Sequence, residues 1–155
     1  MSKNIIILYY SKSGNTELFA KRIFEIFRVF LLEKDINLEM MDAKEINYDK
    51  IKNADALIIG SPDYFSYPSG YIKIFFDEMR DFKKQIKDTP AFTFVTHGGG
   101  GKAAKYIDRL SKSIGLDLVS KCISVEEKDI GKKEEKKIKK ALKEFNDILD
   151  LNLNL

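Results

Sequence analysis

The sequence has few of the residues that covalent cross-links and metal centres require. Cys122 is the only cysteine among 155 residues, so an intramolecular disulfide is impossible. Histidine is equally scarce, with His97 alone, and no cysteine and histidine cluster has the spacing of a metal site. The sequence therefore predicts neither a disulfide framework nor a bound metal.

Long apolar runs and an excess of one charge are missing too. The first apolar run, NIIILYY at residues 4–10, is too short for a signal peptide or a membrane span. The 27 Lys and Arg against 24 Asp and Glu give a formal net charge of +3, too small to indicate nucleic-acid binding. The lysine-rich segment at residues 131–145 has the pattern of a solvated helix face. We therefore expect a cytoplasmic protein that binds neither nucleic acid nor membranes.

The common nucleotide-binding motifs are absent. The sequence contains no GxxxxGK[ST] loop and no GxGxxG fingerprint. A response-regulator receiver domain would need an acidic pair after the first strand, and YYSKSG at residues 9–14 has none. We reject that class, although Asp63 follows the third strand-like run.

Strand-like apolar runs alternate with amphipathic helical segments, which is the pattern of a parallel sheet covered by helices on both faces. With 44% hydrophobic residues, the chain suits a single domain, which we place at residues 1–150, with a frayed tail at 151–155. We expect the strand order 2-1-3-4-5 in a three-layer α/β/α sandwich with a five-stranded parallel sheet. The expected strands lie at 4–10, 36–42, 55–60, 91–97 and 116–125.

Five helices are expected between and after these strands. The first has a buried stripe of Phe19, Ile23, Ile26, Phe27 and Phe30. The last is the lysine-rich segment, with Ile138, Leu142, Phe145 and Leu149 at helical spacing. The other helices are expected to complete the crossovers between parallel strands, and the first four helices lie at about 15–32, 43–52, 69–86 and 102–114.

Three unusual loops follow the first, third and fourth expected strands. In an open α/β sheet, ligands bind beyond the carboxyl ends of the strands where the strand order reverses, here between the first and third strands. We therefore expect these loops to lie together. Their sequences are SKSGNT at 11–16, GSPDYFSYPSG at 60–70 and THGGGGK at 96–102.

SKSGNT indicates an anion-binding loop. It leads directly into a helix, whose first N–H groups lack partners and whose dipole favours negative charge. A helix cap without a ligand needs only one small polar residue, and Gly14 permits close approach of the backbone. This turn offers four such side chains and therefore predicts phosphate binding, by Ser11, Ser13, Asn15 and Thr16.

The other two loops suit a flat ligand. Tyr64, Phe65 and Tyr67 lie among prolines and a glycine and offer a stacking wall, although at least one of them is expected to pack beneath the loop. The four glycines at 98–101 suit close approach of backbone to a ligand or a peptide flip, the alternative being a flexible loop. His97 is our catalytic candidate, as a hydrogen-bond donor or proton relay, or else a passive loop residue.

Together the three motifs resemble the flavodoxin family, and the similarity covers essentially the whole chain in order. The resemblance implies non-covalently bound FMN. Its phosphate would be held by Ser11, Lys12, Ser13, Gly14, Asn15 and Thr16. Its isoalloxazine would be bordered by Pro62, Asp63, Tyr64 and Phe65, with backbone donors from Thr96, His97, Gly98, Gly99, Gly100 and Gly101.

Two departures from typical flavodoxins keep other functions open. Those electron carriers are strongly acidic, whereas this chain is slightly basic. The third loop lacks their acidic residues and aromatic stacker and is closer to flavodoxin-like quinone and NAD(P)H reductases, which are usually longer.

The leading hypothesis is an FMN-dependent carrier of electrons between redox partner proteins or to a small acceptor. The first alternative is a small NAD(P)H-dependent FMN reductase or quinone oxidoreductase, in which His97 would hydrogen-bond the acceptor. The second is a flavin-free interaction module on the same fold.

Overall fold

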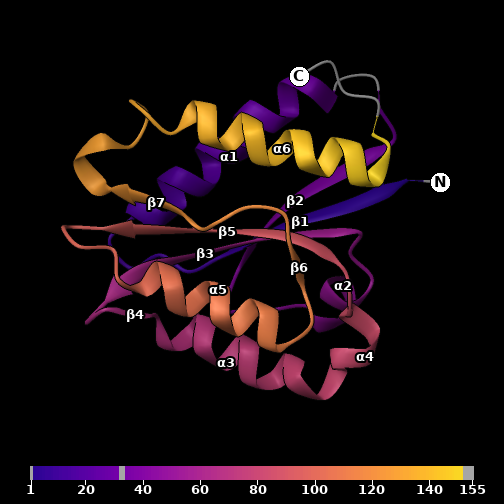
Figure 1. Ribbon diagram of the computed structural model, residues 1–155, viewed down its shortest axis with the longest axis horizontal. Coiled ribbons are helices and arrows are strands. Elements are labelled where there is room, and N and C mark those ends of the chain that lie inside the picture. The colour runs from indigo at the N-terminus through magenta and orange to yellow at the C-terminus, as the bar shows by residue number, and fades with distance from the viewer. Residues whose placement is uncertain (1, 32–33, 152–155) are drawn as a thin grey trace.

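A computed structural model describes residues 2–31 and 34–151 of the chain, which form three layers (Figure 1). A mostly parallel sheet lies in the middle. One face of the sheet carries α1 (Asn15–Leu31) and α6 (Glu135–Leu149). The other face carries α2 (Tyr48–Lys52), α3 (Gly70–Met79), α4 (Lys83–Ile86) and α5 (Ala103–Ser113). Within the described residues, none of the helices is both long enough and apolar enough to cross a membrane.

The described strands follow the predicted order. The main path of the sheet is β2-β1-β3-β5-β6, and every pair along it is parallel. The predicted fifth strand is broken into two short strands that both pair with β5, and β4 forms an antiparallel extension of β3. The strands are β1 (Lys3–Tyr9), β2 (Ile36–Asp42), β3 (Ala56–Tyr64), β4 (Tyr67–Pro68), β5 (Pro90–His97), β6 (Asp117–Leu118) and β7 (Ile123–Glu126).

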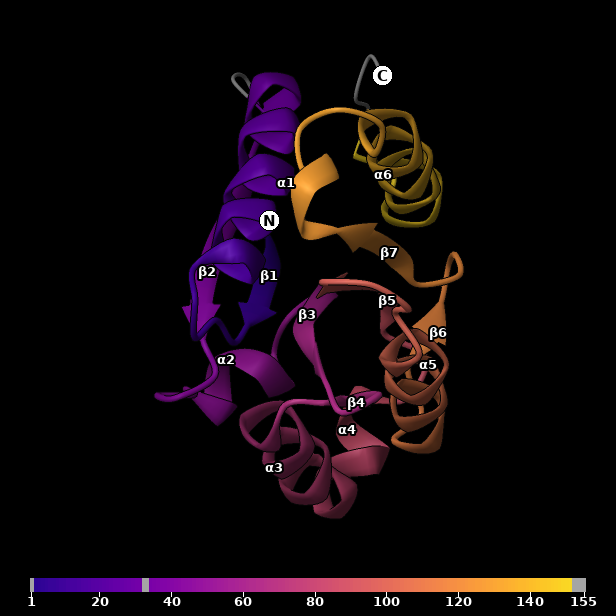
Figure 2. The same ribbon diagram turned by 90° about the vertical axis from the view of Figure 1, so that its left-hand side faces the viewer.

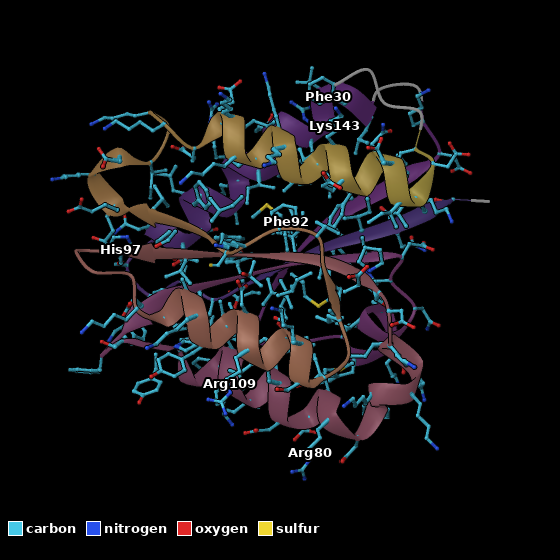
Figure 3. The ribbon with its side chains drawn as sticks, viewed as in Figure 1. Phe30, Arg80, Phe92, His97, Arg109 and Lys143 are labelled. Atoms are coloured by element: carbon cyan, nitrogen blue, oxygen red, sulfur yellow. The ribbon has the colours of Figure 1, made fainter. Side chains whose placement is uncertain are left out.

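Two apolar cores lie on opposite faces of the sheet. Alternate residues of β1 point to opposite faces, so Ile5 and Ile7 join the core beneath α1 and α6, while Ile6 and Leu8 join the core beneath α3 and α5. Phe92, in the middle of the molecule, packs its ring 5.2 Å from the ring of a phenylalanine of α6 (Figure 3). Burial of both faces explains why the central strands are nearly continuous apolar runs.

The second predicted helix is shorter than expected. We placed it at 43–52, but α2 begins at Tyr48 because the preceding residues form a turn on Asp42. The Asp42 side chain accepts a hydrogen bond from the Lys44 N–H, at 2.9 Å, and its carbonyl accepts one from Glu45, at 3.0 Å. Asn47 then caps the helix by accepting from the Lys50 N–H, at 3.1 Å.

Two further boundaries differ from prediction. The single helix expected at 69–86 is divided into three elements. α3 ends at Met79, and the chain then passes through a 3₁₀ turn, η1 (Arg80–Phe82), into α4. Leu151, which we assigned to a frayed tail, is buried, and its N–H donates to the Asn146 carbonyl at 3.1 Å. Residues 152–155 of that tail, and residue 32 of the first predicted helix, lie outside the described residues.

Candidate functional site

The three loops selected from the sequence meet at the carboxyl edge of the sheet, onto which Figure 2 looks directly. The Thr16 and Thr96 hydroxyls, from the first and third loops, are 2.7 Å apart. Asp63 of the second loop accepts a hydrogen bond from the N–H of Ala103, just after the third, at 3.0 Å. Tyr10, just before the first loop, contacts Tyr64 edge to face with ring centroids 6.4 Å apart. Each pair of loops is therefore joined by a contact between loop residues or between a loop residue and the residue next to another loop.

The first loop presents open backbone at the start of α1. Ser11 Oγ accepts a hydrogen bond from the Gly14 N–H at 3.1 Å, and the Gly14 carbonyl accepts the first helical bond, from Leu18, at 2.9 Å. Gly14 has φ +100°, and a Cβ added to it would meet no atom within 4 Å. Lys12, Ser13 and Gly14 are exposed, so the turn that leads into the helix N-terminus is open to solvent, and a helix N-terminus favours an anion.

Thr16 is placed differently from the rest of its loop. Its side chain is buried, with 2% exposure, and its hydroxyl pairs with that of Thr96, which is 1% exposed. One hydroxyl donates to the other in this pair, so one of the two protons stays available. Thr16 could donate to a phosphate only if Thr96 donated to Thr16.

The second loop is a hairpin. β3 continues to Tyr64, so Pro62, Asp63 and Tyr64 lie in a strand, and Phe65 and Ser66 form a two-residue turn to β4. Both turn residues have positive φ, 53° and 72°, as a type I′ turn requires. The Asp63 carboxylate supports this turn by accepting from the Ser66 N–H at 2.8 Å, while its other oxygen holds α5. The turn leaves Phe65 at the tip with 97% exposure.

Three tyrosines at the site were missed by the sequence analysis. Tyr10 stacks on Tyr71 with ring centroids 4.7 Å apart, and Tyr67 of the hairpin lies 4.7 Å from the Tyr106 ring of α5. A signal was available, because Tyr10 directly follows the first strand, and Tyr71 and Tyr106 lie in the first turns of the helices after the two ring-flanking loops. Aromatic rings therefore line both sides of the hairpin.

Tyr64 joins the hairpin to this aromatic group as a neutral phenol. Burial raises the pKa of Tyr64, and its neighbours Tyr10 and Glu127 raise it further. The hydroxyl therefore keeps its proton at neutral pH and remains a hydrogen-bond donor.

The third loop closes over His97, which lies at the end of β5 (Figure 3). Gly98, Gly99 and Gly100 are exposed, whereas Gly101 is buried with φ +61°. A Cβ on Gly101 would lie 2.5 Å from Ser124 Oγ and 2.9 Å from His97 Cδ2, so a larger residue there would force one of these side chains to move. His97 Nδ1 is buried without a hydrogen-bond partner among the described residues. The imidazole therefore packs under the glycine loop, and its catalytic role stays a prediction.

A polar cavity of about 310 Å³ lies between β1, β2 and α2, away from the three loops. Lys50 and Glu39 pair across it at 2.9 Å. Its asparagines make structural hydrogen bonds: Asn37 donates to Asn4 at 3.3 Å, and Asn53 donates to the Asp49 carbonyl at 2.8 Å. These contacts account for its polar lining without a ligand.

Known proteins share this fold and part of the sequence. A flavodoxin from Clostridium saccharobutylicum is 34% identical over 99 residues, a match that covers 63% of this chain and 59% of that relative. The chain thus spans less than two thirds of that protein. The structure of a flavodoxin, WrbA-like protein from Agrobacterium tumefaciens is 22% identical, with a TM-score of 0.75 over 97% of this chain and 100% of that one.

A larger protein contains the same fold as one part. Rubredoxin oxygen:oxidoreductase from Desulfovibrio gigas is 20% identical, with a TM-score of 0.79 over 95% of this chain and 36% of that one. These similarities confirm the expected flavodoxin-like fold, and with the sequence match they support an FMN-binding protein. The model of the NADPH-dependent FMN reductase family matches residues 5–120, three quarters of the chain. The chain therefore belongs to the NADPH-dependent FMN reductase family.

Proposed function

We propose that the protein binds FMN non-covalently at the carboxyl edge of the sheet and carries electrons between redox partners. The observation that supports this proposal best is the set of contacts that join the three loops in pairs. They bring an open helix N-terminus, an aromatic hairpin and exposed glycine backbone to one edge. One end of this site suits a phosphate and the other a flat ring.

The residues present fit this cofactor. Ser11, Ser13 and Asn15, with the N–H groups at the start of α1, would hold the phosphate, and Lys12 would add charge at the exposed rim. The hairpin from Pro62 to Phe65 and the backbone from Thr96 to Gly101 would flank the ring. Bound FMN supplies one- and two-electron redox chemistry, and the protein orients it and limits its contact with water.

An absorbance spectrum and a titration test FMN binding. Apoprotein is titrated with FMN and with riboflavin, which lacks the phosphate. We expect Ser13→Ala to weaken FMN binding about tenfold, or about 1.4 kcal/mol, through loss of one hydrogen bond to a charged group, and to leave riboflavin binding unchanged. Ser113→Ala on the exposed side of α5 is the control. A protein that takes up no FMN would favour the flavin-free interaction module.

The family match favours a second candidate, an NAD(P)H-dependent FMN reductase acting on quinones or similar acceptors. Mixing FMN-loaded protein with NADPH and a quinone separates the two. We expect slow oxidation of NADPH for a carrier, which depends on a separate reductase. Fast turnover by the protein alone would replace the carrier proposal with the reductase.

The physiological partners and the location belong to this proposal as well. A carrier or reductase of this kind would use a redox protein or a small electron acceptor, and we place it in the cytoplasm. Fractionation of the source cells with an antibody against the protein tests the location.

A further inference from the structure

A stripe of cations runs along the exposed side of α5, which we call the α5 stripe. The buried side of this helix carries Ala103, Ile107 and Ser111. The cations are spaced three, four and three residues apart, so they share one face of the helix. All four are exposed, and Figure 3 places Arg109 on the outside of the layer. The α5 stripe consists of Lys102, Lys105, Arg109 and Lys112.

The α5 stripe is not neutralised by neighbouring acids. Some cations elsewhere on the surface pair with carboxylates, as Arg22 does with Glu135 at 2.8 Å, while others, such as Lys136 and Lys140 of α6, make no ion pair among the described residues. No residue of the α5 stripe has an ion-pair partner within the part of the chain that the structure describes. The stripe therefore presents uncompensated positive charge to solvent.

The one acid on the same helix is turned inward. Asp108 accepts a hydrogen bond from the Thr93 hydroxyl at 2.5 Å through one oxygen. Its other oxygen accepts from the Cys122 N–H at 3.0 Å. Both carboxylate oxygens are thus engaged with β5 and the segment before β7, and neither pairs with a cation of the stripe.

The α5 stripe is continuous with the edge where we place the flavin. Lys102 directly follows the four glycines, and Lys105 Nζ lies 5.0 Å from the centroid of the Tyr106 ring, which contacts Tyr67 of the hairpin. A groove of about 760 Å³ beside the stripe adds Lys121 as a fifth cation. This surface thus has aromatic residues at the edge of the sheet where we place the flavin, which we call the redox edge, and cations beside them. Protein interfaces commonly combine an aromatic centre with a polar rim.

We propose that the α5 stripe, with Lys121 and the exposed aromatic residues of the hairpin, docks a redox partner protein whose surface is acidic. This proposal rests on the proposed electron-carrier function. Opposite charges would steer the partner toward the flavin edge and fix its orientation, and the aromatic tip would form the apolar centre of the contact. A nucleic acid fits less well, because the cations adjoin the redox edge and the total charge is only +3.

Two haem proteins of opposite charge serve as probes: cytochrome b5, which is acidic, and cytochrome c, which is basic. Their affinity for the FMN-loaded protein is measured by calorimetry at 20 and 200 mM salt. A stopped-flow assay then follows one electron passing from the reduced flavin to the ferric haem, which becomes ferrous. We compare wild type with Lys105→Glu/Arg109→Glu and with a matched control, Lys136→Glu/Lys140→Glu, which reverses two exposed cations four residues apart on α6.

We expect cytochrome b5 to bind at least tenfold more weakly at the higher salt, and at least tenfold more weakly to the α5 variant at low salt. The α6 control should bind it within twofold of wild type, and cytochrome c should gain affinity for the α5 variant. Equal effects of the two variants on cytochrome b5, or no effect of either, would overturn the docking proposal. A chain that takes up no FMN is recognised beforehand by its spectrum and overturns the proposed function instead.

Discussion

Phe65 adopts a backbone conformation that aromatic residues seldom have. Its φ of 53° lies in the left-handed region, which costs an L-residue other than Gly, Asn or Asp about 1–2 kcal/mol. The ring gains nothing from burial to offset this cost, because it is 97% exposed. A strained and exposed aromatic residue at a ligand edge is typical of a residue kept for binding.

Phe65→Asn should therefore stabilise the apoprotein. Asn tolerates the left-handed region, so we expect the free energy of unfolding to rise by about 0.5–1 kcal/mol, measured by urea denaturation. Phe65→Ala is the control, since it removes the ring but keeps the unfavourable φ. An Asn variant no more stable than the Ala variant would show that the turn carries no such strain.

Cys122 makes stability depend on alkaline pH. Burial raises the pKa of its thiol from the ordinary 9.0 to about 12, and the Asp108 charge adds to this against an opposing hydrogen bond with Thr93. Between pH 9 and 12 the unfolded chain loses the thiol proton while the folded chain keeps it. The free energy of unfolding should therefore fall, by up to about 1.4 kcal/mol per pH unit from this group.

Cys122→Ser isolates that contribution because serine does not titrate in this range. Urea denaturation of both proteins at pH 7.5, 9.0 and 10.0 should show a difference in unfolding free energy that is constant below pH 9 and shifts in favour of the variant above it. Tyr9, Tyr48 and Tyr64, whose pKa values are also raised, affect both proteins alike. A difference that stays constant over the whole range would refute the assignment.

At the scale of elements, the sequence predicted the strands and helices whose positions are set by the periodicity of apolar residues. The central strands were found because burial on both faces leaves a continuous apolar run, and α1, α5 and α6 because one face of each is apolar. The start of α2 and the β3–β4 hairpin depend on single backbone hydrogen bonds accepted by the side chains of Asp42, Asn47 and Asp63, and the periodicity of apolar residues does not reveal such bonds. The fifth strand is split because only its ends pair with β5.

The candidate site was likewise predictable from the sequence only in part. Its three loops could be located because strand order places them together, but the side-chain contacts between them could not. Thr16 and Thr96 are 80 residues apart in the sequence, and only the packing of α1 against the end of β5 brings their hydroxyls together. The same packing buries Thr16, a predicted phosphate ligand, against a residue of another loop, and its contact with a phosphate stays a prediction.

The Thr16–Thr96 pair links α1 to β5 and should show coupled energetics. Thr16→Val or Thr96→Val alone leaves a buried hydroxyl unpaired and should cost about 1–3 kcal/mol of stability. The double variant should cost less than the sum, which a double-mutant cycle by urea denaturation measures. If Thr96 orients Thr16, Thr96→Val should also weaken FMN binding while Thr96→Ser does not, and simple additivity of the two single variants would argue against the link.

At the scale of the whole molecule, charge is distributed unevenly although the total is small. The cations of α1 and α2 are paired with carboxylates, whereas those of the α5 stripe are not paired within the described residues. A net charge of +3 therefore understates the positive charge beside the edge where we place the flavin. The charge near the flavin, rather than the total, should decide how easily the bound flavin accepts negative charge.

This expectation can be tested through the potential of the bound flavin. Two charge-reversal pairs change the total charge equally, but Lys102→Glu/Lys105→Glu acts beside the glycine loop and Lys136→Glu/Lys140→Glu acts on the opposite face. A unit charge about 10 Å from the ring in water contributes about 0.4 kcal/mol, or roughly 20 mV. We therefore expect the first pair to make the potential of the fully reduced state more negative by on the order of 50 mV, and the second to change it far less.

Spectroelectrochemical titration at low and high salt measures both shifts, and the first should shrink as salt screens it. Equal shifts from both pairs would show that total charge, not the α5 stripe, sets the potential.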